Sequence, residues 1–169
     1  MTDAPLPFAD LQAANQIYVD QFGLDGLHAT AAKGLAIVTC MDSRIEPLGL
    51  FGLAPGDAKI LRNAGGRVTD DVLRTLVLAV YLLGVTRVVI MPHTRCRMAQ
   101  SSEDEIHELI AEQHGVDTSS LTFQVIEDPL QVLRSDVAAV RSHSMLPPDL
   151  QVAGAIYDVD TGAVSFIPD

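Results

Sequence analysis

The chain has 169 residues, of which 48% are hydrophobic and 20% are charged, and its formal net charge is −11 at pH 7. This composition is typical of one folded domain with an aliphatic core and excludes a disordered chain. The acidic balance argues against nucleic-acid binding, which requires clustered Lys and Arg. We therefore expect a single domain over residues 1–169 that acts on a small molecule.

Neither a membrane span nor an export signal is indicated by the sequence. The N-terminus, MTDAPLPFADLQ, lacks a basic region followed by an apolar run, and no segment reaches the roughly 18 consecutive apolar residues of a membrane span. We expect a soluble protein of the cytoplasm that binds no membrane. In that reducing compartment Cys40 and Cys96 favour a metal-binding or catalytic role over a disulfide, which remains the alternative.

The first half of the chain predicts two helices and two strands, the first of which is buried. Apolar side chains recur at helical spacing over residues 6–22, which predicts an amphipathic helix. The continuous apolar run LAIVTC at 35–40 predicts a strand buried on both faces, and AKILRNAGG at 58–66 predicts a shorter strand stopped by a glycine pair. Residues 69–84 predict a helix that is apolar almost all round, so we expect it to be buried on more than one face.

The second half continues the alternation of strands and helices. RVVIMPH at 87–93 predicts another buried strand, and residues 101–115 predict a surface helix that begins with a capping box. Residues 121–126 predict a short edge strand, and residues 129–143 predict a helix with proline at its first position. Two final strands joined at residues 160–162 predict a hairpin.

This order predicts an α/β fold with a mainly parallel central sheet, flanking helices and an antiparallel C-terminal edge hairpin. In such sheets the ligand site lies at the carboxyl ends of adjacent strands. Cys40 ends the first predicted strand, while His93 and Cys96 follow the third. If those strands are neighbours, the three side chains converge.

Two thiolates and one imidazole suit zinc, and three protein ligands leave a fourth position open, as in catalytic zinc sites. In the segment Cys40-Met41-Asp42-Ser43-Arg44, alternate residues leave the strand end on the same side. Asp42 is therefore expected beside the metal with Arg44 as its partner. The carboxylate could accept a hydrogen bond from a metal-bound hydroxide, or become the fourth ligand if Arg44 releases it.

The segments CMDSR (40–44), RNAGG (62–66) and HTRC (93–96), in this order and at these separations, resemble the β-class carbonic anhydrases. The resemblance is close over residues 33–100. It implies one zinc ion per subunit, held by Cys40, His93 and Cys96, and a catalytic dyad of Asp42 and Arg44. It also implies a homodimer or higher homo-oligomer that hydrates CO2 reversibly to bicarbonate.

The chain departs from that family beside the second cysteine. The family commonly has a small or acidic residue before this cysteine and glycine after it, whereas Arg95 and Arg97 stand here. Arg97 gives up the backbone freedom of glycine and is expected to crowd the pocket, while both positive charges favour a zinc hydroxide and attract bicarbonate. We therefore expect a retained zinc site with altered activity. A solvated loop face, or a salt bridge to the acidic run 103–105, is the alternative role of the two arginines.

Three functions are compatible with these residues. The leading one is carbonic anhydrase, a zinc-dependent lyase. The second is a related zinc hydrolase of carbonyl sulfide or carbon disulfide, since some relatives with the same ligands act on these molecules. The third is a catalytically weakened zinc-binding homologue that binds an anion or a partner. The Asp42–Arg44 pair favours catalysis, because a purely structural zinc site needs no such dyad.

Overall fold

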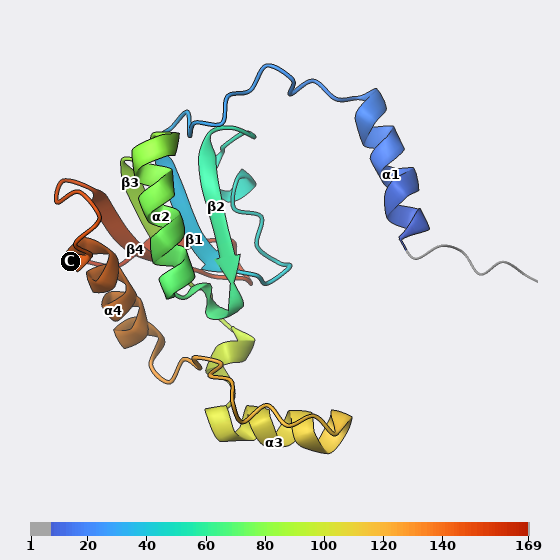
Figure 1. Ribbon diagram of the computed structural model, residues 1–169, viewed down its shortest axis with the longest axis vertical. Helices are drawn as coiled ribbons and strands as arrows, with labels where there is room; N and C mark the ends of the chain where they lie inside the picture. The colour runs from blue at the N-terminus through green and yellow to red at the C-terminus, as the bar shows by residue number, and fades with distance from the viewer. Residues whose placement is uncertain (1–7, 169) are drawn as a thin grey trace, which may run out of the picture.

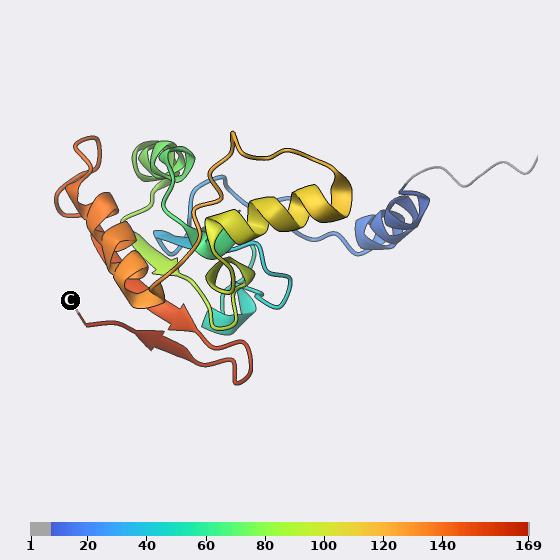
Figure 2. The same ribbon diagram turned by 90° about the horizontal axis from the view of Figure 1, so that it is seen from below.

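A computed structural model describes residues 8–168 of the chain, which is drawn in two views in Figures 1 and 2. Over these residues the chain forms a five-stranded sheet with the order β2-β1-β3-β4-β5. The first four strands of that order are parallel, and β5 is antiparallel to β4. The strands are β1 (Leu35–Cys40), β2 (Ala58–Asn63), β3 (Arg87–Met91), β4 (Gln151–Tyr157) and β5 (Val164–Phe166). The predicted α/β fold and its C-terminal antiparallel hairpin are confirmed.

The α-helices of the described residues are α1 (Ala9–Asp20), α2 (Asp70–Leu83), α3 (Glu103–His114) and α4 (Pro129–Ser142). Helices α2 and α4 cover one face of the sheet (Figure 1), whereas α1 and α3 stand away from it. Helix α2 begins at the N-cap Thr69, and α3 begins with the predicted capping box. Among residues 8–168, no helix combines the length and apolarity that a membrane crossing requires.

The central strand β1 is buried along its whole length because packed side chains cover both of its faces. Ala36 and Val38 point into a core with α2 and α4. Leu35 and Ile37 point to the opposite face, where the connection between β1 and β2 covers them. Burial on both faces fixes the register of β1 against its neighbours, and with it the position of the strand end.

Two of the predicted elements differ from the structure. Residues 121–126 form no strand, because the carboxylate of Glu103 accepts the backbone N–H groups of Phe123 and Val125. Gln124 between them has a φ of 58°, which breaks an extended conformation. Helix α2 buries only the face that packs on the sheet, and its opposite face exposes Leu78, Tyr81 and Leu82 in this single chain.

The turn after β2 approaches the end of β1 so closely that only glycine fits. Gly66 has a φ of 67°, and a Cβ atom there would lie 2.9 Å from the backbone N of Cys40 and 2.9 Å from the backbone carbonyl carbon of Thr39. Neither backbone atom can move without shifting β1. Gly66, the second residue of the glycine pair that stops the predicted second strand, is therefore also a packing requirement at the carboxyl end of β1.

We expect Gly66→Ala to lower the free energy of unfolding by about 3 kcal/mol, because a left-handed backbone and a backbone clash both oppose the added methyl group. Urea unfolding monitored by circular dichroism measures this loss. Gly115→Ala is the matched control, since Gly115 has a similar φ of 65° but nothing within 4 Å of the added Cβ. Gly115→Ala should lower the free energy of unfolding by only about 1 kcal/mol. Equal losses at the two positions would contradict the close approach.

Candidate metal centre

Cys40, His93 and Cys96 converge at the carboxyl end of the parallel sheet. Cys40 is the last residue of β1, and His93 and Cys96 follow the neighbouring strand β3. All three side chains are buried, and their ligand atoms lie within 4.8 Å of one another, a spread that one metal ion can bridge. The convergence expected from the predicted strand order is confirmed.

The imidazole of His93 is oriented as a metal ligand. Its Nδ1 lies 2.8 Å from the carbonyl oxygen of Thr94 and donates to it, since a carbonyl can only accept. This bond leaves the unprotonated Nε2 facing the two sulfur atoms, the usual arrangement of a zinc-bound histidine. Nε2 is buried and has no hydrogen-bond partner among residues 8–168. A buried nitrogen without a partner is costly unless a cation binds it, so the donor set fits zinc.

The two thiols favour a cation between them electrostatically. The neighbouring Cys96 thiol lowers the pKa of Cys40, and His93 and the backbone N–H groups of Asp42 and Gly65 add to this effect. Conversely, the thiolate of Cys40 raises the pKa of Cys96. One proton is thus shared between the two sulfur atoms. A soft divalent cation replaces that proton readily.

Asp42 and Arg44 form a two-pronged ion pair beside the ligand cluster. Arg44 Nε lies 2.9 Å from Asp42 Oδ1, and Arg44 Nη2 lies 2.7 Å from Asp42 Oδ2. These bonds hold the pKa of Asp42 well below its usual range, so the carboxylate stays ionised at neutral pH. Asp42 Oδ2 is 3.8 Å from His93 Nε2, which is too long for a hydrogen bond but places the carboxylate at the edge of the metal centre.

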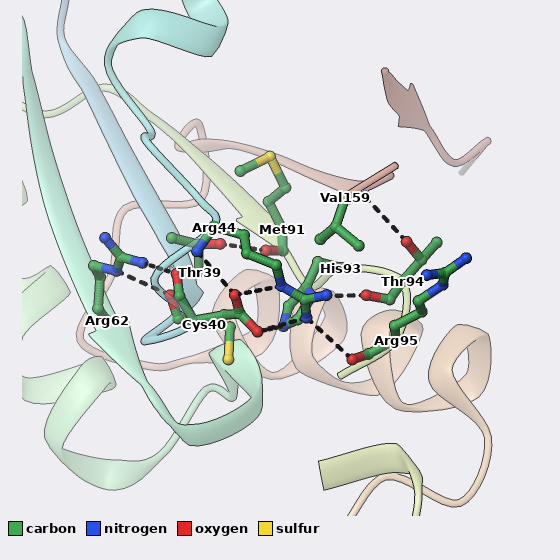
Figure 3. Close-up of polar contacts among 10 residues, drawn as sticks. Thr39, Cys40, Arg44, Arg62, Met91, His93, Thr94, Arg95 and Val159 are labelled. Atoms are coloured by element: carbon green, nitrogen blue, oxygen red, sulfur yellow. Dashed lines mark hydrogen bonds and ion pairs between the residues drawn. The ribbon is translucent and has the colours of Figure 1, made fainter. Parts of the chain in front are cut away.

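Arg62 holds the loop between the cysteine and the aspartate. Its Nε donates to the carbonyl oxygen of Cys40 at 2.9 Å, and its Nη2 donates to the carbonyl oxygen of Asp42 at 2.6 Å (Figure 3). The sequence predicts Arg62 within the strand at 58–66 but does not indicate these bonds. The signal that could have found them is strand pairing, because Arg62 lies opposite Thr39 in the register of β1 and β2.

The expectations for the two flanking arginines are corrected by the structure. Arg97 is exposed, has no left-handed backbone and donates to the hydroxyl of Ser101 at 2.8 Å, so it does not crowd the pocket. The left-handed residue is Arg95, with a φ of 54°. Its guanidinium pairs with Asp160 at 2.8 Å rather than with the acidic run 103–105.

The cluster also bears on the alternative of a purely structural zinc site, which would have four protein ligands. Within residues 8–168, the grouping of potential ligands at this place contains only Cys40, His93 and Cys96. Asp42, the candidate for a fourth ligand, is held by Arg44. The arrangement is that of a site with one open position.

Comparison with known proteins agrees with this geometry. The family model described as carbonic anhydrase matches residues 35–117. A solved carbonic anhydrase from Streptococcus mutans is 40% identical and superimposes with a TM-score of 0.90, covering 98% of this chain and 100% of that one. β-Carbonic anhydrase 1 of Mycobacterium tuberculosis is 29% identical over 134 residues, which is 79% of this chain and 82% of the relative.

The relatives also include enzymes of a second activity. A carbon disulfide hydrolase of Acidithiobacillus thiooxidans is 30% identical over 164 residues, covering 83% of this chain and 74% of the relative. The shared fold, the converging cysteine, histidine and cysteine, and the extent of these matches lead to one conclusion: this chain belongs to the β-carbonic anhydrase family.

Proposed function

We propose that the chain catalyses the reversible hydration of carbon dioxide to bicarbonate with one zinc ion held by Cys40, His93 and Cys96. When bound, zinc supplies the Lewis acidity that makes water nucleophilic near neutral pH. The observation that carries the proposal is the Asp42–Arg44 ion pair, which places a carboxylate at the edge of a three-ligand cluster. A binding protein would not require a charged acceptor at that place.

Asp42 and Arg44 have separate tasks in this proposal. The ionised carboxylate of Asp42 accepts a hydrogen bond from the attacking water and orients it toward carbon dioxide. Arg44 keeps the carboxylate ionised and, through two hydrogen bonds, holds it away from the ligand cluster. The open position consequently stays available to water and substrate.

Carbon disulfide is the alternative substrate, because a relative of 30% identity is a carbon disulfide hydrolase. Both reactions add water to a linear molecule with an electrophilic carbon, so the same ligand cluster serves either one. We favour carbon dioxide because the carbonic anhydrase of S. mutans is more similar, at 40% identity over the whole of that chain. Substrate assays on the zinc-loaded protein separate the two.

We expect Asp42→Asn to lower the rate of carbon dioxide hydration about 100-fold, because the amide can neither carry the charge nor accept as strongly as the carboxylate. Stopped-flow indicator kinetics on the zinc-loaded variant measures this rate. Asp71→Asn is the control, since Asp71 pairs with Arg74 on the exposed start of α2. A variant that hydrates carbon dioxide at the unaltered rate would remove Asp42 from the mechanism.

A second prediction concerns the proposed zinc ligands and is tested by the zinc content, without an activity assay. His93→Ala should reduce the bound zinc from one ion per chain to well below one after dialysis, because two thiolates alone hold the metal weakly. Plasma emission spectroscopy on the dialysed protein counts the ions. His114→Ala should keep one ion per chain, since His114 is exposed at the end of α3. Retention of the full zinc content by His93→Ala would show that the ion binds elsewhere.

We further propose that the chain functions as a homodimer in the cytoplasm, with α1 packed on the second copy. Helix α1 has no buried residue, and it exposes Leu11, Ile17 and Tyr18 far from the sheet (Figures 1 and 2). An isolated helix of 12 residues is marginal in water without a packing partner. The outward face of α2 is also apolar and exposed, so each copy offers such a surface.

Charges placed on α1 test this assembly. We expect the pair of substitutions Leu11→Asp and Tyr18→Asp to convert the dimer to a monomer, because both side chains would carry charge into the interface. Analytical ultracentrifugation reports the mass. Gln12→Asp with Asn15→Asp adds the same charge at polar positions and should leave the dimer intact. The proposal would be contradicted if the unmodified chain sedimented as a monomer. It would also be contradicted if the variant with Leu11→Asp and Tyr18→Asp remained a dimer like the control variant.

A further inference from the structure

Arg95 has a backbone conformation that arginine seldom adopts. Its φ of 54° lies in the left-handed region, which only a few per cent of non-glycine residues occupy. The residue stands between the ligands His93 and Cys96, so its conformation belongs to the loop that carries both. Such conformations persist where the surroundings hold them, and they concentrate at functional sites.

The consequence of this conformation is the direction of the Arg95 carbonyl group. Its oxygen accepts a hydrogen bond from Arg44 Nη2 at 3.3 Å, and the same nitrogen donates to Asp42 Oδ2 at 2.7 Å. Figure 3 shows the guanidinium of Arg44 reaching the Arg95 carbonyl, while the Arg95 side chain points away from it. The loop that carries the metal ligands is thereby joined to the Asp42–Arg44 pair through one backbone oxygen.

The end of β4 and the turn between β4 and β5 hold this loop from the outside. The hydroxyl of Thr94 accepts from the N–H of Val159 at 3.1 Å, and the N–H of Thr94 donates to the carbonyl of Tyr157 at 2.9 Å. Asp160, on the same turn, pairs with the Arg95 guanidinium. The side chains of this ion pair are 65% exposed at Arg95 and 48% exposed at Asp160. The ion pair therefore contributes little to holding the loop compared with the hydrogen bonds of Thr94.

We propose that Arg95 is a positioning residue for the reaction: its left-handed backbone places its carbonyl oxygen on Arg44, and this bond orients the Asp42–Arg44 pair at the metal centre. The proposal rests on the roles given to Asp42 and Arg44 under the proposed function. It assigns the effect to the backbone of Arg95 and not to its charge. A residue that disfavours left-handed backbone should therefore be harmful at this position, and one that tolerates it should not.

The experiment compares Arg95→Val with Arg95→Asn. The two side chains are similar in size and both lack the guanidinium, but valine disfavours the left-handed region and asparagine tolerates it. We expect Arg95→Val to lower kcat for carbon dioxide hydration roughly tenfold, with KM little changed and one zinc ion per chain. Arg95→Asn should stay within about twofold of the unmodified protein. Arg95→Ala, with a milder steric cost, should fall between them and serves if the valine variant does not fold.

Two controls separate positioning from stability and from charge. Gln124→Val places the same side chain at another left-handed residue, with a φ of 58°, whose carbonyl accepts from Arg67 and which makes no hydrogen bond to Asp42 or Arg44. It should lower the melting temperature but leave kcat unchanged. Asp160→Asn removes the exposed ion pair and should also leave kcat unchanged.

A direct readout is hydrogen exchange at the Arg44 Nη2–H groups, which donate to the Arg95 carbonyl and to Asp42, followed by nitrogen-15 NMR. Loss of the bond to the Arg95 carbonyl should accelerate this exchange about fivefold in Arg95→Val, the ratio expected for one net hydrogen bond, and leave it unchanged in Arg95→Asn. Equal kcat and equal exchange in the two variants would overturn the positioning role. If Asp42→Asn also keeps full activity, the role proposed for the Asp42–Arg44 pair fails, and the positioning role fails with it. If only the Arg95 variants are unaffected, the dyad stands and the positioning role is wrong.

Discussion

The parallel pairing of β1 with β3 is the constraint on which the metal centre depends. Thr39 lies opposite Met91 in the register, so the chain leaves both strands at the same edge of the sheet, next to each other. The buried hydroxyl of Thr39 donates to the carbonyl of Met91 at 2.7 Å and ties these two ends together. Since core packing on both faces fixes the register, the ligand atoms are brought together by folding itself and need no movement of the strands.

Three separate segments then support the loops that carry the ligands. The turn after β2 packs Gly66 against the backbone of Cys40, Arg62 holds the carbonyl groups of residues 40 and 42, and the turn between β4 and β5 holds Thr94. These supports contact the main chain of residues 40 and 42 or, at Thr94, the hydroxyl of the residue next to His93. Substitutions in these segments therefore act on the position of the ligands without touching the metal, which is how supporting residues around metal sites commonly act.

The fold and the ligand set were predictable because they rest on local patterns. The apolar run at 35–40 is long enough for a buried strand, and Cys40, His93 and Cys96 follow strands that an alternating order makes parallel. The edge strand at 121–126 was predicted wrongly because the backbone N–H groups of Phe123 and Val125 donate to the carboxylate of Glu103, a contact with a helix that no local pattern encodes.

The effects of Arg95 and Arg97 were unpredictable for a related reason. Sequence indicates which residue replaces glycine, but the backbone conformation depends on hydrogen bonds from other segments. Here the left-handed residue lies before the second cysteine and not after it, and the partner of Arg95 is an aspartate 65 positions further along the chain. The two arginines are therefore surface residues by their side chains, and only Arg95 acts on the site, through its backbone.

The most direct test of this account is the rate of carbon dioxide hydration by one preparation, measured zinc-loaded, after removal of the metal by a chelator, and after reloading. The account predicts fast hydration with one zinc ion per chain, loss of it on chelation and recovery on reloading. A loaded protein that holds one zinc ion and hydrates carbon dioxide no faster than buffer would contradict it.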